Sequence, residues 1–392
     1  VLSRKIYGKD LVYFDNAATS QRPQSVIDEW NRITCESNAN IHRAVHKLAD
    51  EATQAYEQAR DIVKDFINAE FREEIIFTSG TTASVNLAAF CFGEAYIKEG
   101  DEVIVTEAEH HSNIVPWQMM CRRKGAILKV LPIDDSGHLI IDELDSLITD
   151  RTRIMAVTHI SNVLGIVNPV KDIVEKCHSK GVAVLVDGAQ GAVHCKVDVR
   201  DMDCDFYVFS GHKLYAATGT GVLYGKKKWL ENMPPYMGGG EMVGTVKFSG
   251  TTYAPLPMKY EAGTQNFASA ATLKPAIELL NILNDNNLEE YNNSIKDYLL
   301  NILINDERIR LYGVPRGTSE EKIPLFSFTV KGIHHEDLAL ILDKMGIAVR
   351  SGQMCAEPLM DRFGVTGMLR ISLAPYNTMQ EAEYFVKCLN KA

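Results

Sequence analysis

The chain has 392 residues, more than one hydrophobic core usually serves, so we expect about two domains. Its net charge of −10 argues against nonspecific binding to nucleic acid or to an anionic membrane surface, and no apolar run approaches the roughly 20 residues of a transmembrane span. The eight cysteines form no C-x-x-C pair, which argues against a zinc ribbon and indicates a reducing, cytoplasmic setting. The first ten residues lack the apolar core of a signal peptide, but Val1 is not a start methionine, so an upstream targeting segment stays an open question.

The first elements in the chain are a short strand within residues 11–20 and an amphipathic helix over residues 46–67, where small and apolar residues recur in steps of three and four. From residue 74 onward, near-continuous apolar strands alternate with helices. We predict strands at 74–78, 103–105, 127–131, 153–158, 182–186, from 206, and at 221–224. This rhythm predicts an α/β fold with a mainly parallel, seven-stranded sheet covered by helices on both faces.

The last third of the chain has a different pattern. Residues 231–266 are rich in Gly, Pro and Thr, which predicts long loops or a hairpin. The next predicted elements are a helical stretch over 272–303, a strand at 324–330, a helix at 335–346, a strand at 368–372 and a terminal helix from 379. We therefore predict a large domain over residues 15–280 and a smaller α+β domain that combines residues 1–14 with 281–392.

The strongest chemical signal lies between Phe206 and Tyr215. A run of aromatic and β-branched residues predicts a buried strand, which breaks at Ser210 and presents His212 and Lys213. Open α/β sheets bind their ligands at this place, outside the carboxyl ends of the strands. A partly desolvated lysine there can lose its proton near neutral pH and act as a nucleophile or form a Schiff base. Taken alone, an exposed lysine in a turn is the ordinary alternative.

Polar residues follow other strands of the predicted sheet. Ser79–Thr82 opens a helix, where backbone N–H groups and hydroxyls can bind phosphate, although such residues are often plain N-caps. His110, Asn162 and Asp187 with Gln190 follow further strands, and each alone is compatible with an ordinary turn. The chain has neither G-x-x-x-x-G-K-[ST] nor G-x-G-x-x-G, so a P-loop or a Rossmann dinucleotide site is not supported.

Together these strand ends supply what pyridoxal 5′-phosphate requires. They offer a phosphate cradle, the His110 ring for stacking, amide donors for a phenolate oxygen, the Asp187 carboxylate for a pyridinium nitrogen, and Lys213 for a Schiff base. Five strand ends that agree in this way are hard to produce by accident. We therefore predict pyridoxal 5′-phosphate as the cofactor, and no metal site.

The chain resembles a cysteine desulfurase of the fold-type I, class V aminotransferase superfamily, and in particular its SUF-type, or group II, branch. The resemblance extends from Phe14 to Leu373, nearly the whole chain. The matching segments are Asn40–Arg43, Ser79–Thr82, Glu109–Trp117, Thr158–Gly165, Val186–Gln190, Ser210–Tyr215, Tyr260–Thr264 and Val349–Ala356.

The resemblance implies the cofactor contacts. Lys213 would form the Schiff base and later move the Cα proton of the substrate. Asp187 would pair with the pyridinium nitrogen, and His110 would stack on the ring and assist proton transfer. Asn162 and Gln190 are implied near the ring hydroxyl. The residues implied at the phosphate are Thr81, Thr82, Ser210 and His212, with Thr264 from the other subunit of a homodimer.

The resemblance also implies the substrate contacts. Arg370, helped by Arg350 and near Asn162, would clamp the carboxylate of L-cysteine, because a bidentate guanidinium matches a planar carboxylate. The Cys355 thiolate would attack the substrate sulfur, which leaves alanine and a persulfide on the enzyme. Its loop contains glycine and lies between Arg350 and Arg362, a setting that favours an accessible, thiolate-prone sulfur. The short interval from Cys355 to Arg370 is similar to the short, ordered cysteine loop of group II.

Three departures from the family pattern leave questions open. Met354 stands where many relatives have histidine, which concerns activation of the thiol and substrate preference. Ala216 and Ala217 replace a Gly-Pro pair beside the lysine loop, and Ala83 stands where some relatives have a glutamate in cross-subunit contacts. None of these positions is a core cofactor residue.

The leading hypothesis is an L-cysteine desulfurase that passes persulfide sulfur to an acceptor protein of the SUF system for iron–sulfur cluster assembly. One alternative is a lyase that acts on L-selenocysteine, and another is a different class V lyase or transaminase. A catalytically silent sulfur-relay scaffold is the alternative from a different functional class. Intact Lys213, Asp187 and Arg370 argue against that scaffold.

Overall fold

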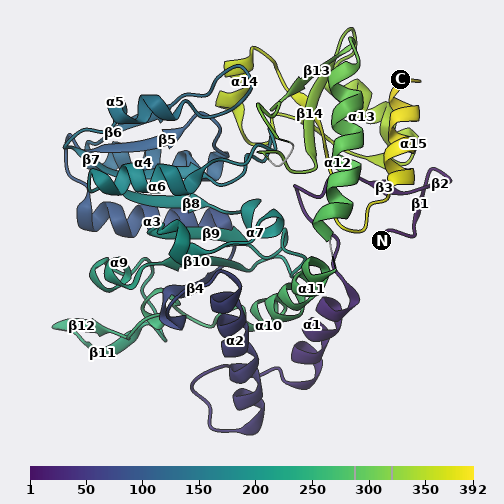
Figure 1. The fold of residues 1–392 in the computed structure, drawn as a ribbon. Coiled ribbons are helices and arrows are strands. Elements are labelled where there is room, and N and C mark those ends of the chain that lie inside the picture. The colour runs from purple at the N-terminus through teal and green to yellow at the C-terminus, as the bar shows by residue number, and fades with distance from the viewer. Residues whose placement is uncertain (287, 319–320) are drawn as a thin grey trace.

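The central element of the computed structural model, which describes residues 1–286, 288–318 and 321–392, is a seven-stranded sheet (Figure 1). Its strand order is β4-β10-β9-β8-β7-β5-β6, and β10 alone among these described strands runs antiparallel to the rest. The strands are β4 (Ile75–Thr78), β5 (Glu102–Thr106), β6 (Ile127–Leu131), β7 (Thr152–Thr158), β8 (Ala183–Asp187), β9 (Phe206–Ser210) and β10 (Gly221–Gly225). The prediction of a mainly parallel, seven-stranded sheet is confirmed.

Helices cover both faces of this sheet, which explains why its strands are apolar at nearly every position. Successive side chains of a strand point to opposite faces, so Leu185 packs in one hydrophobic core while Val184 and Val186 pack in the other. The first core is covered by α3 (Thr81–Tyr96), α4 (Val115–Lys124) and α9 (Lys227–Asn232). The second is covered by α1 (Gln24–Glu36), α2 (Lys47–Phe66), α5 (Leu144–Leu147), α6 (Val170–Ser179), α7 (Gly191–His194), α8 (Val199–Met202), α10 (Phe267–Ala271) and α11 (Leu273–Asp285).

A third hydrophobic core is formed by residues from the N-terminal and the C-terminal parts of the chain. The four-stranded antiparallel sheet β13-β14-β17-β16 packs with helices from the C-terminal part, and β3 (Val12–Tyr13) pairs in parallel with β15 (Ile347–Ala348) beside it (Figure 1). Phe14 is buried in this core with residues such as Phe326 and Phe385. The elements of this part are β13 (Ile309–Tyr312), β14 (Leu325–Val330), β16 (Arg350–Gly352), β17 (Met368–Ser372), α12 (Leu288–Asn305), α13 (His335–Lys344) and α15 (Met379–Leu389). The short helix α14 (Glu357–Phe363) packs instead in the second core, against the large sheet.

The domain boundaries and one residue of a predicted helical stretch stay open, whereas the predicted hairpin within 231–266 is present. The division into 15–280 and 1–14 with 281–392 stays a prediction. The predicted helical stretch over 272–303 includes residue 287, which lies outside the described residues. Within 231–266 the chain forms the hairpin of β11 (Val243–Lys247) and β12 (Gly250–Tyr253), which extends away from the sheet (Figure 1). In the part of the chain that the structure describes, no helix has both the length and the apolar composition that crossing a membrane requires.

A cluster at the amino ends of the parallel strands predicts a pH-dependent stability. His178 bridges two carboxylates, with Nδ1 3.1 Å from Asp203 Oδ2 and Nε2 2.8 Å from Asp205 Oδ2, and the pKa of His178 is raised, chiefly by its hydrogen bond to Asp205. Because this pKa is higher in the folded than in the unfolded state, the stabilisation is fully present below the unfolded value of about 6.5. It is lost as the pH rises through the folded value. We expect His178→Gln to lower Tm more at about pH 6 than at about pH 8.5, and equal losses in thermal denaturation at both values would contradict this.

Candidate active site

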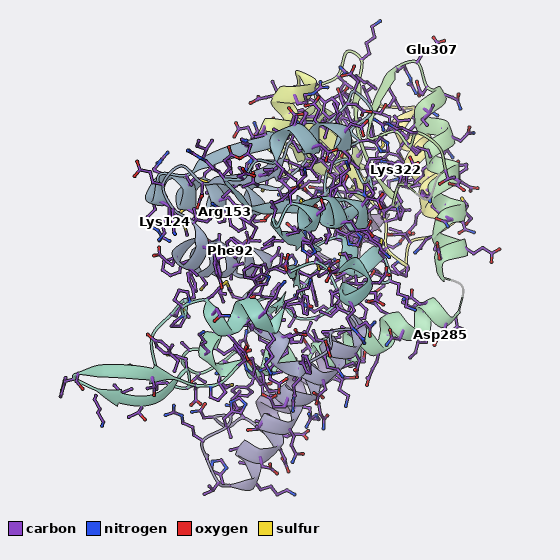
Figure 2. All side chains as sticks on the ribbon, turned by 60° about the vertical axis from the view of Figure 1, so that its left-hand side comes forward. Phe92, Lys124, Arg153, Asp285, Glu307 and Lys322 are labelled. Atoms are coloured by element: carbon purple, nitrogen blue, oxygen red, sulfur yellow. The ribbon has the colours of Figure 1, made fainter. Side chains whose placement is uncertain are left out.

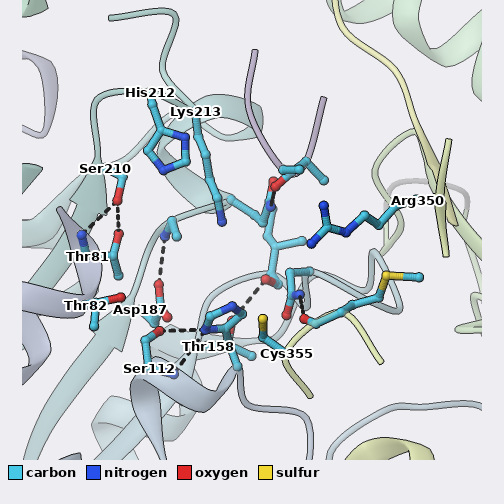
Figure 3. A pocket seen from close by; sticks show the side chains of 18 of the residues that line it. Thr81, Thr82, Ser112, Thr158, Asp187, Ser210, His212, Lys213, Arg350 and Cys355 are labelled. Atoms are coloured by element: carbon cyan, nitrogen blue, oxygen red, sulfur yellow. Dashed lines mark hydrogen bonds between the residues drawn. The ribbon is translucent and has the colours of Figure 1, made fainter. Parts of the chain in front are cut away.

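The predicted site residues meet at the carboxyl edge of the large sheet. With the exception of Thr264, all of them line the same cavity, whose volume is about 220 Å³ (Figure 3). The large sheet contributes residues that follow β4, β5, β7, β8 and β9, and the part of the chain around β16 and β17 closes the opposite side. The predicted residues in the lining are Thr81, Thr82, His110, Asn162, Asp187, Gln190, Ser210, His212, Lys213, Arg350, Cys355 and Arg370.

Lys213 has the electrostatic setting of a nucleophilic amine. Its side chain extends into the cavity from the turn after β9 (Figure 3). Burial lowers the pKa of Lys213 to about 8, and the Asp187 carboxylate partly opposes this shift. Near neutral pH a useful fraction of this lysine is therefore the neutral amine, the form that attacks a carbonyl carbon.

Asp187 ends β8 and is buried beneath the cavity. Its Oδ1 accepts a hydrogen bond of 2.9 Å from the backbone N of Ala189. Burial raises the pKa of Asp187, while the hydrogen bond from Ala189 and the charge of Lys213 lower it. A carboxyl group in this position is suited to hold a proton on a heterocyclic nitrogen that enters the cavity.

The end of the cavity beside α3 gathers N–H and O–H groups of the kind that bind anions. Ser210 Oγ accepts a hydrogen bond of 2.8 Å from Thr81 N and lies 2.7 Å from Thr81 Oγ1, at the N-terminus of this helix. The turn before α3 packs closely against the first residue of β10, because a Cβ on Gly221 would lie only 2.4 Å from the Cα of Gly80. Together with the hydroxyl of Thr82, these N–H and O–H groups fit the oxygens of a phosphate.

Two histidines of the lining are held neutral. Burial lowers the pKa of His110 to about 4 and that of His212 to about 4, and the charge of Lys213 adds to both shifts. His110 Nδ1 accepts a hydrogen bond of 3.1 Å from Ser112 N and lies 2.8 Å from Ser112 Oγ, which fixes the ring at the side of the cavity. A neutral, fixed imidazole is suited to stack on a planar ring.

Arg370 on β17 presents an incomplete set of hydrogen bonds. Its Nη1 donates to Asn162 O at 2.8 Å and its Nη2 to Asp15 Oδ1 at 3.1 Å. Its Nε is buried and has no partner among the described residues. Because a buried donor without a partner is costly, a carboxylate that enters the cavity would be bound here. Arg350 lies opposite Arg370 in the β16–β17 pairing and adds a second positive charge.

The loop before α14 holds an exposed thiol against the cavity. Met354 and Cys355 have φ values of 54° and 56°, an unusual left-handed conformation for two successive non-glycine residues. Two hydrogen bonds stabilise it: Asn162 Nδ2 donates to Met354 O at 2.9 Å, and His111 N donates to Cys355 O at 2.7 Å. The Cys355 sulfur points to the space in front of Lys213 (Figure 3).

Sequence reasoning missed several residues of the site. Asp15 orients Arg370, and it follows a short buried strand as Asp187 does, which was an available signal. Glu109 is fully buried, and burial raises its pKa to about 8. Hydrogen bonds from Thr106, Asn113 and Thr158 lower this pKa and partly offset the effect of burial. The other lining residues that were not predicted are Ala17, Ala18, Ser112, Thr158, Ile160, Ala189 and Met354.

Thr264 does not line the cavity of its own chain and is exposed. Its contribution from a second subunit stays a prediction. Gln190 lines the cavity, but its Nε2 donates to Ala17 O at 3.0 Å, so its free carbonyl oxygen is the group left for a ligand.

The fold and the lysine at the centre of the cavity are those of a known class of enzyme, and comparison with known proteins shows which class it is. The model of the aminotransferase class V family matches residues 12–385, and the chain therefore belongs to that family.

Similar proteins within the family are cysteine desulfurases. The chain is 45% identical over 387 residues to the cysteine desulfurase of Cronobacter sakazakii, which covers 98% of this chain and 94% of that protein. It is 44% identical to a probable cysteine desulfurase of Vibrio cholerae, over 100% of this chain and 96% of that one. The crystal structure of the cysteine desulfurase CsdA of Escherichia coli, in its S-sulfonic acid form, matches with a TM-score of 0.90 at 40% identity, over 97% of this chain and 94% of that one. These matches place the chain among the cysteine desulfurases and do not single out the SUF-type branch.

Proposed function

We propose that this protein is a pyridoxal 5′-phosphate-dependent cysteine desulfurase, which converts L-cysteine to L-alanine and keeps the sulfur as a persulfide on Cys355. The observation that carries the proposal is that Lys213 and Cys355, which belong to distant parts of the chain, face one cavity together with Arg370. An aminotransferase needs the lysine and the arginine, whereas a thiol opposite the lysine has a use only if sulfur is removed.

The side chains of the cavity fit this cofactor. The hydroxyls and N–H groups around Thr81, Thr82 and Ser210, with His212 beside them, would hold its phosphate. Asp187 would bind the ring nitrogen and the neutral His110 ring would cover one face, with Asn162 and Gln190 on the side of the ring oxygen. When bound, the cofactor supplies an electron sink for the negative charge that develops at the substrate Cα. The amine of Lys213 holds the cofactor and then, released, takes the proton from Cα.

The sulfur chemistry is carried by Cys355. Its sulfur attacks the sulfur of L-cysteine, so that an S–S bond forms while the bond between Cβ and sulfur breaks. The electron pair of the broken bond goes to the carbon chain, which takes up one proton at Cβ, regains the Cα proton from Lys213 and leaves as alanine. Arg370 and Arg350 hold the substrate carboxylate in this arrangement, with Asp15 fixing the orientation of Arg370.

The test is product analysis of the purified holoenzyme. With L-cysteine as the sole substrate we expect alanine, together with a mass increase of one sulfur on the peptide that contains Cys355. Release of alanine with no sulfur on that peptide would contradict the role of the thiol. Turnover that depends on an added keto acid would instead indicate a transaminase.

We further propose the setting in which the enzyme works. The exposed thiol of Cys355 supports transfer of the persulfide sulfur to an acceptor protein, and we expect that acceptor to belong to a SUF system for iron–sulfur cluster assembly in the cytoplasm. The exposure of Thr264 supports a homodimer in which this residue completes the phosphate site of the partner. A monomer in sedimentation analysis, or a Thr264→Ala enzyme with unchanged cofactor affinity, would contradict the dimer proposal.

Arg370→Lys should weaken substrate binding more than it affects the chemical step. Lysine provides a point charge but loses the paired donors that match a carboxylate. Because a hydrogen bond to a charged group contributes about 1.5–3 kcal/mol, we expect kcat/KM for L-cysteine to fall about 10- to 100-fold, mostly through KM. Steady-state kinetics measures this, with Arg362→Lys on the neighbouring helix as the control. A wild-type KM for Arg370→Lys would show that the carboxylate binds elsewhere.

A further inference from the structure

The turn after β7 is held by an uninterrupted series of donors from the C-terminal part of the chain. Four successive backbone carbonyl oxygens, those of residues 162–165, each accept a hydrogen bond from that part. Such a series fixes the position of the turn relative to the β14–β17 pair more tightly than one contact would. The four bonds are Arg370 Nη1 to Asn162 O (2.8 Å), Ser327 Oγ to Val163 O (2.5 Å), Lys322 Nζ to Leu164 O, and Ile323 N to Gly165 O (3.0 Å).

Lys322 is the least expected member of this series. Its side chain is 1% exposed and lies inside the molecule, whereas the labelled Lys124 lies at the periphery (Figure 2). Burying an amine of this kind is costly unless it makes good hydrogen bonds. Its Nζ donates to Leu164 O and lies 5.4 Å from the centre of the Phe326 ring. Burial lowers the pKa of Lys322 to about 7, and both the charged and the neutral amine can donate to a carbonyl oxygen.

The turn that Lys322 holds is connected directly to the thiol. Asn162 is the first residue of the turn, and its side-chain amide donates to Met354 O at 2.9 Å. Met354 and Cys355 have left-handed backbones, which persist only where surrounding contacts enforce them. A displacement of the turn would therefore loosen the hydrogen bond that keeps the cysteine loop in this conformation.

We propose that Lys322 is a positioning residue for the cysteine loop: it holds the turn of residues 162–165, so that Asn162 keeps Cys355 in front of Lys213. The proposal rests on the function proposed above for its kinetic consequence but not for its structural one. Ser327 holds the neighbouring carbonyl oxygen, that of Val163, in the same way. Its contribution to the position of the turn is smaller than that of Lys322, because it donates through a short neutral hydroxyl.

The test compares Lys322→Met, which keeps the length and apolar stem of the side chain, with Lys322→Arg, which keeps a donor. Lys259→Met is the matched control, because Lys259 Nζ also donates to backbone carbonyls, those of Leu230 and Glu231, but away from the cavity. Amide hydrogen exchange is measured on peptides that cover residues 161–167 and 353–357. We expect Lys322→Met to accelerate exchange in both segments by at least about tenfold, the factor expected from the loss of one strong hydrogen bond.

Lys322→Arg should restore part of the protection from exchange, and Lys259→Met should leave exchange in these two segments unchanged. In Lys322→Met we also expect kcat for L-cysteine to fall while KM stays nearly unchanged. If Lys322→Met does not fold, Ser327→Ala should show the same pattern with a smaller effect. Faster exchange confined to residues 161–167, or an equal change throughout the molecule, would overturn the proposal. Amide hydrogen exchange does not depend on turnover. A wild-type protein that released no alanine would therefore refute the proposed function, but the exchange data would still test whether Lys322 positions the cysteine loop.

Discussion

Lys213→Ala is expected to abolish alanine release from L-cysteine. In the proposed mechanism the side chain that it removes is both the anchor for the cofactor and the base for the Cα proton, and no other lysine lines the cavity among the described residues. Loss of a positioned base alone lowers rates by about 10²–10⁴-fold, so the combined loss should reach at least about 10³-fold. The measurement is alanine release by the reconstituted variant, together with the absorbance spectrum of the bound cofactor.

The spectrum separates loss of covalent attachment from loss of folding. We expect Lys213→Ala to bind the cofactor reversibly, because Asp187 and the N–H and O–H groups beside α3 remain, and to lose it on dialysis. Lys228→Ala, which changes an exposed lysine at the far edge of the sheet, is the control and should behave as the wild type. Retention of a tenth of wild-type turnover by Lys213→Ala would refute the assignment.

Cys355→Ser is expected to stop sulfur transfer while leaving substrate binding intact. A hydroxyl has nearly the size of a thiol but is a far weaker nucleophile, and a neutral serine forms no persulfide. Arg370 and Lys213 are unchanged, so L-cysteine should still alter the cofactor spectrum. We expect alanine release to fall by at least about 10²-fold, with Cys35→Ser, at an exposed cysteine outside the cavity, as the control.

The same variant distinguishes between two substrates. Selenium leaves carbon more readily than sulfur, so an enzyme that acts mainly on L-selenocysteine should depend less on Cys355. We expect Cys355→Ser to lose activity on L-cysteine and to retain more of its activity on L-selenocysteine. Undiminished release of alanine from L-cysteine would exclude the thiol from the reaction, and a protein that cannot be reconstituted with the cofactor would favour the silent scaffold.

The large sheet and its polar edge could be predicted because their signals are local. Buried parallel strands are apolar on both faces, so their bounds follow closely from the sequence; β8, predicted at 182–186, extends over Ala183–Asp187 with every residue buried. Asp187 and Ser210 follow from the same rule, since the first polar residue after such a strand lies at its carboxyl edge.

Other features depend on contacts between distant residues. Cys355 and Arg370 were assigned from the resemblance, because neither follows a strand of the large sheet and only the tertiary structure brings them to the cavity. Asp15 and Glu109 act on other side chains rather than on a ligand. The position of Asp15 after a short strand is visible in the sequence, but its pairing with the distant Arg370 is not. β13 was not predicted, because a four-residue edge strand with one buried position has no clear alternation.

The pairing of β3 with β15 has a consequence for how the molecule is made. The large sheet is continuous in the sequence and can assemble while the ribosome is still working, as domains generally do. Val12 and Tyr13, by contrast, must wait for partners that are translated close to the end. Arg350, Cys355 and Arg370 are therefore the last residues to reach the cavity, and a nascent polypeptide cannot begin to mobilise sulfur before its synthesis is nearly finished.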